Sequence, residues 1–244
     1  MPVATRVAPR SRFYLYMAMV FLAISIAGFS TTFLIPLSRG AFRAPPLIHV
    51  HGALLFGWLL FFILQASLVH RRRVLTHRQL GVVGSLLCIA VVVSGVQVGL
   101  FATRRDLAGA GDGDGEAFVL GQFINVLIEM LLFGSLVFAA VLFRKDTETH
   151  KRLLLLATIS VIGPAWFRLR HLMPWMPQPL VVFGLLADSL LLVAMARDWR
   201  MMRRIHPAYL WGGGAMVSVH VVELLAITSD PWQRLARWLL GVPA

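Results

Sequence analysis

The sequence predicts an all-α membrane protein, a polytopic bundle of about seven transmembrane helices. Charged residues make up only 14% of its 244 residues, whereas soluble domains carry roughly 25%. Hydrophobic residues make up 58% and gather in seven long runs, with no alternating strand pattern between them. A helix needs about 20 apolar residues to cross the hydrocarbon core, and the runs are of that length.

The runs divide the chain into a single transmembrane domain, residues 1–230, and a terminal segment, residues 231–244. The first run is longer than a signal-peptide core, so we interpret it as a retained span. The expected spans cover residues 13–38, 48–69, 80–102, 117–143, 151–172, 179–197 and 207–228.

The terminal segment has the pattern of a helix that lies in the membrane interface. Trp232, Leu235 and Leu239 are spaced to share one helical face. Arg234 and Arg237 then point elsewhere, toward water and headgroups. We therefore expect an interfacial carboxyl-terminal helix.

The basic residues predict the orientation. The formal net charge is +12, and most of the 23 lysines and arginines flank the spans on the side of the amino terminus. By the positive-inside rule, the amino terminus is expected in the cytoplasm and the carboxyl terminus outside. Nearly all of these residues are arginine, which favours a bacterial source and the cytoplasmic (inner) membrane. Charge at span ends indicates anionic lipid headgroups as the partner, not nucleic acid; a homo-oligomer or a membrane complex stays open.

Three histidines open spans on the cytoplasmic side in a repeated pattern. His77, His150 and His206 each follow an arginine by six residues. Thr76 and Thr149 precede two of them and are suited to cap the helix starts. The pattern predicts three related hairpins plus one added span. The histidines form either a ring that binds haem or metal, or, as we favour, interfacial groups beside lipid phosphates.

The same loops carry a resemblance to a known group of proteins. The segments Thr76-His77-Arg78-Gln79-Leu80-Gly81 and His150-Lys151-Arg152-Leu153, followed by Ala157-Thr158-Ile159-Ser160, carry it, together with His49-Val50-His51, Trp58 and Gln65. In these residues the chain resembles a family of uncharacterised bacterial integral membrane proteins. The resemblance covers spans two to five. It implies a seven-span helical fold in a bacterial membrane and brings no established activity.

Ionisable residues inside the spans are the main functional candidates, because charge in hydrocarbon is costly. Glu129 and Asp188 are expected near the middle of the bilayer. His51, His220 and Glu223 are expected in its outer half. We therefore predict a pocket in the outer half, lined by histidines and carboxylates.

A metal site is one interpretation of this pocket. His220 and Glu223 are three residues apart and share a helical face. His51 and Glu129 complete a candidate ligand set that suits a divalent metal, zinc or iron, with haem b as a further candidate. The alternative is a polar network that also includes Asn125, Arg168, Asp188 and His171.

The possible functions follow from these interpretations. The first is a metal- or haem-dependent enzyme or redox protein. The second is a small transporter or proton-coupled carrier, and the third is a structural or assembly protein. A break in span seven at Gly212-Gly213-Gly214, before His220, would favour a transporter. No motif assigns a catalytic residue, so whether the chain is an enzyme stays open.

Overall fold

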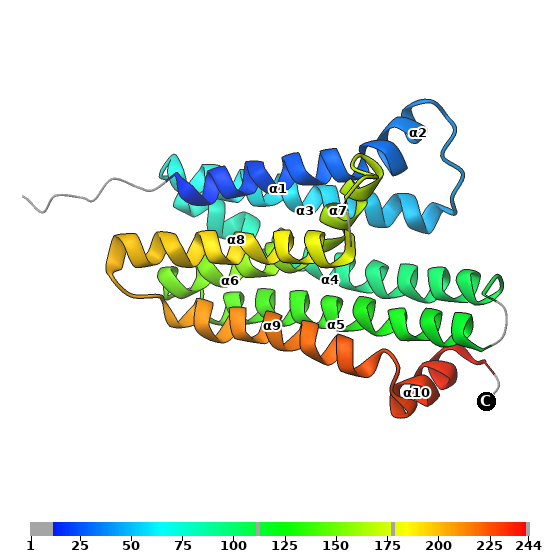
Figure 1. Ribbon diagram of the computed structural model, residues 1–244. Helices are drawn as coiled ribbons and strands as arrows, with labels where there is room; N and C mark the ends of the chain where they lie inside the picture. The colour runs from blue at the N-terminus through cyan, green and yellow to red at the C-terminus, as the bar shows by residue number, and fades with distance from the viewer. Residues whose placement is uncertain (1–11, 111–112, 177–178, 243–244) are drawn as a thin grey trace, which may run out of the picture.

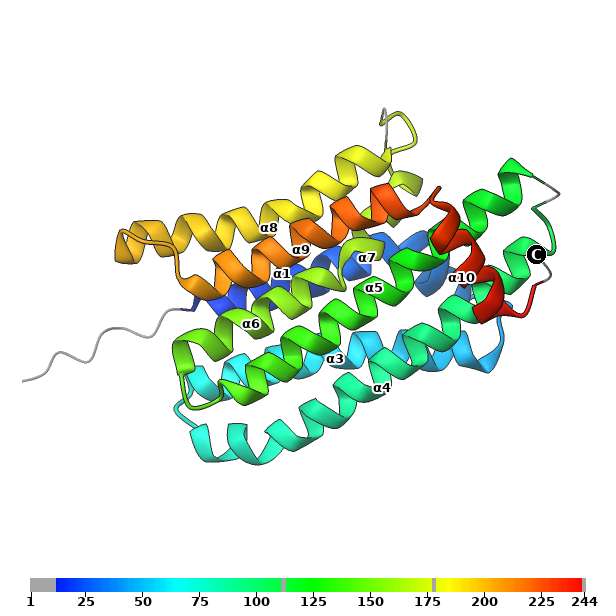
Figure 2. The ribbon, with the colours of Figure 1, turned by 90° about the horizontal axis from the view of Figure 1, so that it is seen from below.

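The computed structural model describes residues 12–110, 113–176 and 179–242, and every regular element in those ranges is a helix. Long helices lie side by side in a bundle in both ribbon views (Figures 1 and 2). In chain order the elements are α1 (Phe13–Phe29), η1 (Ser30–Leu34), α2 (Ile35–Ser38), α3 (Pro46–His70), α4 (Val74–Leu107), α5 (Asp114–Leu142), α6 (Thr147–Ser160), α7 (Gly163–Arg168), η2 (Leu169–His171), α8 (Pro179–Met202), α9 (Pro207–Ala226) and α10 (Asp230–Leu240).

Five segments of the described chain are long and apolar enough to cross a membrane, which indicates a membrane protein. They are Phe13–Ser38, Pro46–His70, Val74–Leu107, Gly115–Leu142 and Thr147–His171. The expected spans 13–38, 48–69, 80–102, 117–143 and 151–172 correspond to these five. Helices α8 and α9 run alongside them in both views but are not among the five. The all-helical membrane fold is thus confirmed, whereas the count of seven spans and the repeated hairpins stay predictions.

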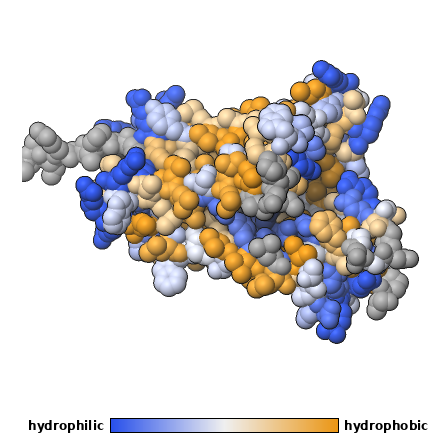
Figure 3. Space-filling model, viewed as in Figure 1, coloured by the Kyte–Doolittle hydropathy of each residue, from blue (hydrophilic) through white to orange (hydrophobic). Residues whose placement is uncertain are grey.

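The surface supports this assignment. Large apolar side chains such as Leu86, Leu131 and Phe138 are more than 60% exposed on the long helices. The space-filling view shows orange side chains over the middle of the bundle and blue ones gathered at its two ends (Figure 3). A water-soluble protein rarely exposes so much contiguous apolar surface.

The helices start where local chemistry permits. Asp146 caps α6, because its Oδ1 accepts from the backbone N–H groups of Glu148 at 3.0 Å and Thr149 at 3.3 Å. The expected caps are wrong: Thr149 lies inside α6, and Thr76 lies inside α4, which already begins at Val74. Both helices begin earlier than the apolar runs do, because polar residues continue the first turn at the headgroup level.

The fifth span is broken. Helix α6 ends at Ser160 and α7 begins at Gly163, with Pro164 in the first turn of α7. Proline has no N–H to donate and clashes with the preceding turn, so a continuous helix is disfavoured here. Helix α9, in contrast, is continuous through Gly212-Gly213-Gly214. A discontinuity therefore exists, but in a different helix from the one in which the glycines suggested it.

The glycines of α4 allow close packing on α5. Gly95 lies directly under the side chain of Met130, and Gly99 lies under that of Val126, so that a Cβ atom at either position would collide. This agrees with the small-residue packing pattern of membrane helices. The core nearby holds Trp58, whose indole N–H donates to Thr158 Oγ1 at 3.2 Å and whose ring meets Phe133 edge-on.

Helix α10 lies across the end of the bundle (Figure 2). Its buried face consists of Trp232, Ala236 and Leu240, and the Trp232 indole N–H donates to the Leu120 carbonyl of α5 at 2.9 Å. Leu235 and Leu239, which were expected to share an apolar face with Trp232, are 46% and 37% exposed. The apolar arc is wide enough to serve two surroundings: one half packs on α5, and the other faces away from the protein.

Candidate functional site: the acid–histidine layer

Four of the residues singled out by sequence lie together on three helices. Glu129 comes from α5, Asp188 from α8, and His220 and Glu223 from α9; we name this set the acid–histidine layer. Asp188 Oδ2 lies 3.3 Å from His220 Nδ1, so these two form a pair across helices.

The other two carboxylates are close enough to influence the pair. The charges of Glu129 and Glu223 both act on His220, and they act on each other. Glu223 Oε1 is buried and has no hydrogen-bond partner among the described residues. A buried carboxylate oxygen without a donor is costly, so this group is suited to take up a proton or a cation.

The break in the fifth span lies beside this layer. A Cβ atom built on Gly163 would lie 3.7 Å from Glu129 Oε1, which puts the first residue of α7 next to that carboxylate. Helix ends expose backbone N–H and C=O groups that a continuous helix would satisfy internally. Glu129 therefore faces a discontinuous helix.

The layer is open to one side of the bundle. The side chains of His220 and Asp188 are 41% and 30% exposed. Figure 3 shows a hydrophilic patch between α8 and α9 in a surface that is otherwise apolar at this depth. The pair thus has access from the space between these two helices.

His51 belongs to a different group. Ser94 donates its hydroxyl proton to the Val91 carbonyl at 3.1 Å, and its Oγ lies 3.0 Å from His51 Nδ1. The Ser94 hydroxyl therefore links the His51 ring to the backbone of α4. His51 is thereby oriented by α4 and not by α9.

The candidate metal ligands do not converge in this geometry. Among residues 12–110, 113–176 and 179–242 there is no group of three or more His, Cys, Asp or Glu side chains that could hold a metal ion. The set His51, Glu129, His220 and Glu223 stays a sequence prediction, with two members, His220 and Glu223, one helical turn apart.

The remaining members of the predicted polar network have partners of their own. Arg168 donates to the Pro164 carbonyl at 3.2 Å and stacks over the ring of Phe29. Asn125 donates to Gln122 Oε1 at 3.0 Å. His171 is exposed at the end of η2. Arg168 therefore holds α7 to α1, and no ion pair joins it to Glu129 in the described structure.

The histidines at the opposite end have separate roles. The rings of His77 and His150 meet edge-on, 6.3 Å between centroids, and His150 Nδ1 lies 2.7 Å from the Ala140 carbonyl oxygen. His206 instead caps α9, where its Nδ1 accepts from the Ala208 N–H at 3.2 Å. Burial and the charge of Arg152 lower the pKa of His206, which keeps the accepting form of its ring.

Sequence reasoning missed a buried, bidentate ion pair. Arg152 of α6 makes a bidentate pair with Asp198 of α8, Nε to Oδ2 at 2.7 Å and Nη2 to Oδ1 at 2.9 Å, and its Nη1 reaches Glu148 at 2.6 Å. The two side chains of the pair are 1% and 0% exposed. One sequence signal could have indicated this pair: Asp198 is an acidic residue that directly follows Arg197 at a helix end rich in arginine.

Comparisons of the chain with protein-family models, with curated proteins and with solved structures find no match.

Proposed function

We propose that this membrane protein is a small proton-coupled carrier whose working site is the acid–histidine layer. The observation that carries the proposal is the Asp188–His220 pair, which joins two helices at 3.3 Å and is partly exposed between them. An imidazole beside a carboxylate accepts and releases a proton without a large rearrangement.

The surroundings of the pair support the proposal. Ionisable groups within membrane helices are expensive and commonly mark ion or proton pathways. Here Glu129 and Glu223 add two carboxylates whose charges reach His220, and Glu223 Oε1 lacks a donor. A proton or a cationic substrate relieves the repulsion between these acids.

The broken fifth span also favours a carrier. Many transporters bind their ions at discontinuous helices near the middle of the membrane. The break between Ser160 and Gly163 lies beside Glu129. We further propose seven spans in a bacterial inner membrane, with the amino terminus in the cytoplasm and the layer in the outer half.

Flux in vesicles tests the proposal. Purified protein is reconstituted into liposomes that contain a pH-sensitive dye, and a potassium diffusion potential drives proton entry. The intact protein should acidify the lumen, and Asp188→Asn should reduce the rate to that of protein-free vesicles. Asp106→Asn, which removes an exposed acid of the Arg105–Asp106 pair, is the control and should leave the rate unchanged. Equal rates for the intact protein and for Asp188→Asn contradict the proposal.

A metal- or haem-dependent activity is the second candidate, and the one-turn spacing of His220 and Glu223 favours it. An absorption spectrum and an elemental analysis of the purified protein test it. Stoichiometric zinc or iron that is lost in His220→Ala would support this candidate over the carrier.

A further inference from the structure

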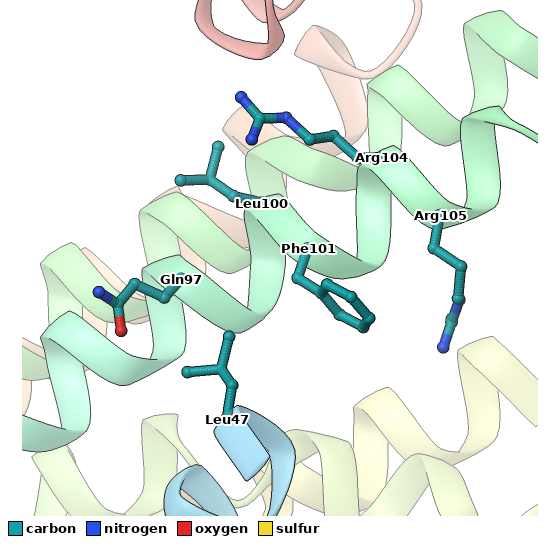
Figure 4. A pocket seen from close by; sticks show the side chains of 6 residues that line it. All are labelled: Leu47, Gln97, Leu100, Phe101, Arg104 and Arg105. Atoms are coloured by element: carbon teal, nitrogen blue, oxygen red, sulfur yellow. The ribbon is translucent and has the colours of Figure 1, made fainter. Parts of the chain in front are cut away.

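An open surface groove, which we call the cavity, lies at the α10 end of the bundle, outside the acid–histidine layer. It has a volume of about 690 Å³ and is lined by Leu47, Gln97, Leu100, Phe101, Arg104 and Arg105 (Figure 4). Leu47 is in the first turn of α3, and the other five lie on α4. Positions 97, 100, 101, 104 and 105 form one stripe of a helix. This stripe faces away from the buried stripe that contains Gly95 and Gly99.

The cavity changes in character along the helix axis. The two arginines occupy the last turn of α4, where the apolar segment ends. Leu100, Phe101 and Leu47 form apolar walls below them (Figure 4). Gln97 lies roughly 10 Å deeper than Arg104, at 1.5 Å per helical residue. A ligand that fills this space must be charged at one end and apolar over the rest.

One of the arginines is available for a ligand. Arg105 is engaged by Asp106, with Nε and Nη2 at 2.8 Å and 2.7 Å from Oδ1. Arg104 is exposed, and its guanidinium has no ion pair or hydrogen bond among the described residues. An unpaired guanidinium at the headgroup level attracts phosphate oxygens.

We propose that this cavity binds one anionic phospholipid, with its phosphate on Arg104 and its acyl chain along Leu100, Phe101 and Leu47. The arginine explains the preference for an anionic headgroup, and the apolar walls explain the preference for a lipid over a free phosphate. The site is independent of the proposed carrier activity.

Lipid binding to the purified full-length chain tests this proposal. Delipidated protein is titrated with phosphatidylglycerol, with phosphatidylcholine of the same acyl chains, and with glycerol phosphate, and bound lipid is counted by native mass spectrometry. Phosphatidylglycerol should bind most tightly. Arg104→Gln should weaken it about fivefold, the effect expected for one basic residue at a membrane surface.

The matched control is Arg39→Gln, which removes the same charge from an exposed arginine at the same end, outside the cavity lining. It should leave the affinity for phosphatidylglycerol unchanged. Phe101→Gln should lower that affinity, because it disturbs the apolar wall. Thermal unfolding confirms that each variant is folded. Equal binding of the two lipids, displacement of lipid by glycerol phosphate, or equal effects of the two arginine variants would each overturn the proposal.

Discussion

Two ionic groups in this protein are built in opposite ways. The Arg152–Asp198 pair is bidentate, almost completely buried and supported by Glu148. The Asp188–His220 pair has a single 3.3 Å contact, is partly exposed, and lies near two further carboxylates. In the first group each charge has an opposite charge in direct contact. In the second group three carboxylates lie near a single histidine. Of the two, only the second has groups free to exchange a proton or bind a cation.

The difference separates stability from function. A buried pair that loses one partner leaves an uncompensated charge, which is strongly destabilising. A histidine that loses its carboxylate can become neutral, so the fold tolerates the change. The predictions below test whether the two groups divide these roles.

The largest effect is expected at the buried pair. Asp198→Ala leaves the guanidinium of Arg152 without its main acceptor, so the free energy of unfolding should fall by about 3–5 kcal/mol. Thermal or denaturant unfolding in detergent measures it. Asp106→Ala, at an exposed pair, should change it by no more than about 0.5 kcal/mol. Similar losses in the two variants would show that the buried pair is not a structural contact.

The second prediction concerns the acid–histidine layer. Asp188→Asn keeps the shape of the side chain and removes its charge, so unfolding should become easier by only about 1 kcal/mol. Proton flux should nevertheless be lost. If Asp188→Asn unfolds as readily as Asp198→Ala, Asp188 has a structural role, and the two ionic groups do not differ in function as proposed.

The smallest effect is expected at the helix caps near the buried pair. The His206 cap requires a neutral ring, and its lowered pKa means that the folded state binds its proton less readily than the unfolded chain. The stabilisation is therefore complete above the unfolded pKa of about 6.5 and is lost as the pH falls through the lower folded value. Arg152 opposes protonation, whereas Asp146, Glu148 and Asp198 favour it.

Stability measured at about pH 8 and about pH 5 tests this cap. His206→Ala should reduce the stability at pH 8 by roughly 1 kcal/mol and remove part of the acid sensitivity. The control is Asp106→Ala, which removes an exposed acid that is not among the charges acting on His206. Its effect should be the same at the two pH values; an unchanged acid response in His206→Ala would contradict the assignment.

Hydropathy predicted the long helices because a span of lipid imposes its length on the chain. The run at 13–38 matches Phe13–Ser38, and Pro164 marks the break in the fifth span. Helix faces were harder to predict. On α10, Ala236 is buried, although its small side chain gave no indication of this in the sequence. Leu235, in contrast, faces outward. Periodicity identifies an apolar arc but not which part of it meets protein.

Partners across helices could not be predicted from one sequence. Arg152 and Asp198 are separated by 46 positions, and nothing local indicates that α6 and α8 bring them together. The same limit applies to His51, whose spacing allowed contact with α9 but whose ring bonds Ser94 of α4. Glu129, Asp188, His220 and Glu223 could be singled out from the sequence because helical rise alone places each of them inside an apolar span.

The length of α4 has a consequence for the whole bundle. At 1.5 Å per residue its 34 residues extend about 51 Å, whereas the hydrocarbon core is roughly 30 Å thick. The excess is accommodated by tilt or by turns that emerge among the headgroups. Because Gly95 and Gly99 press α4 against α5, the two helices cannot tilt independently. Membranes of different thickness would therefore change the inclination of both helices together, and with it the height of Glu129 relative to the bilayer midplane.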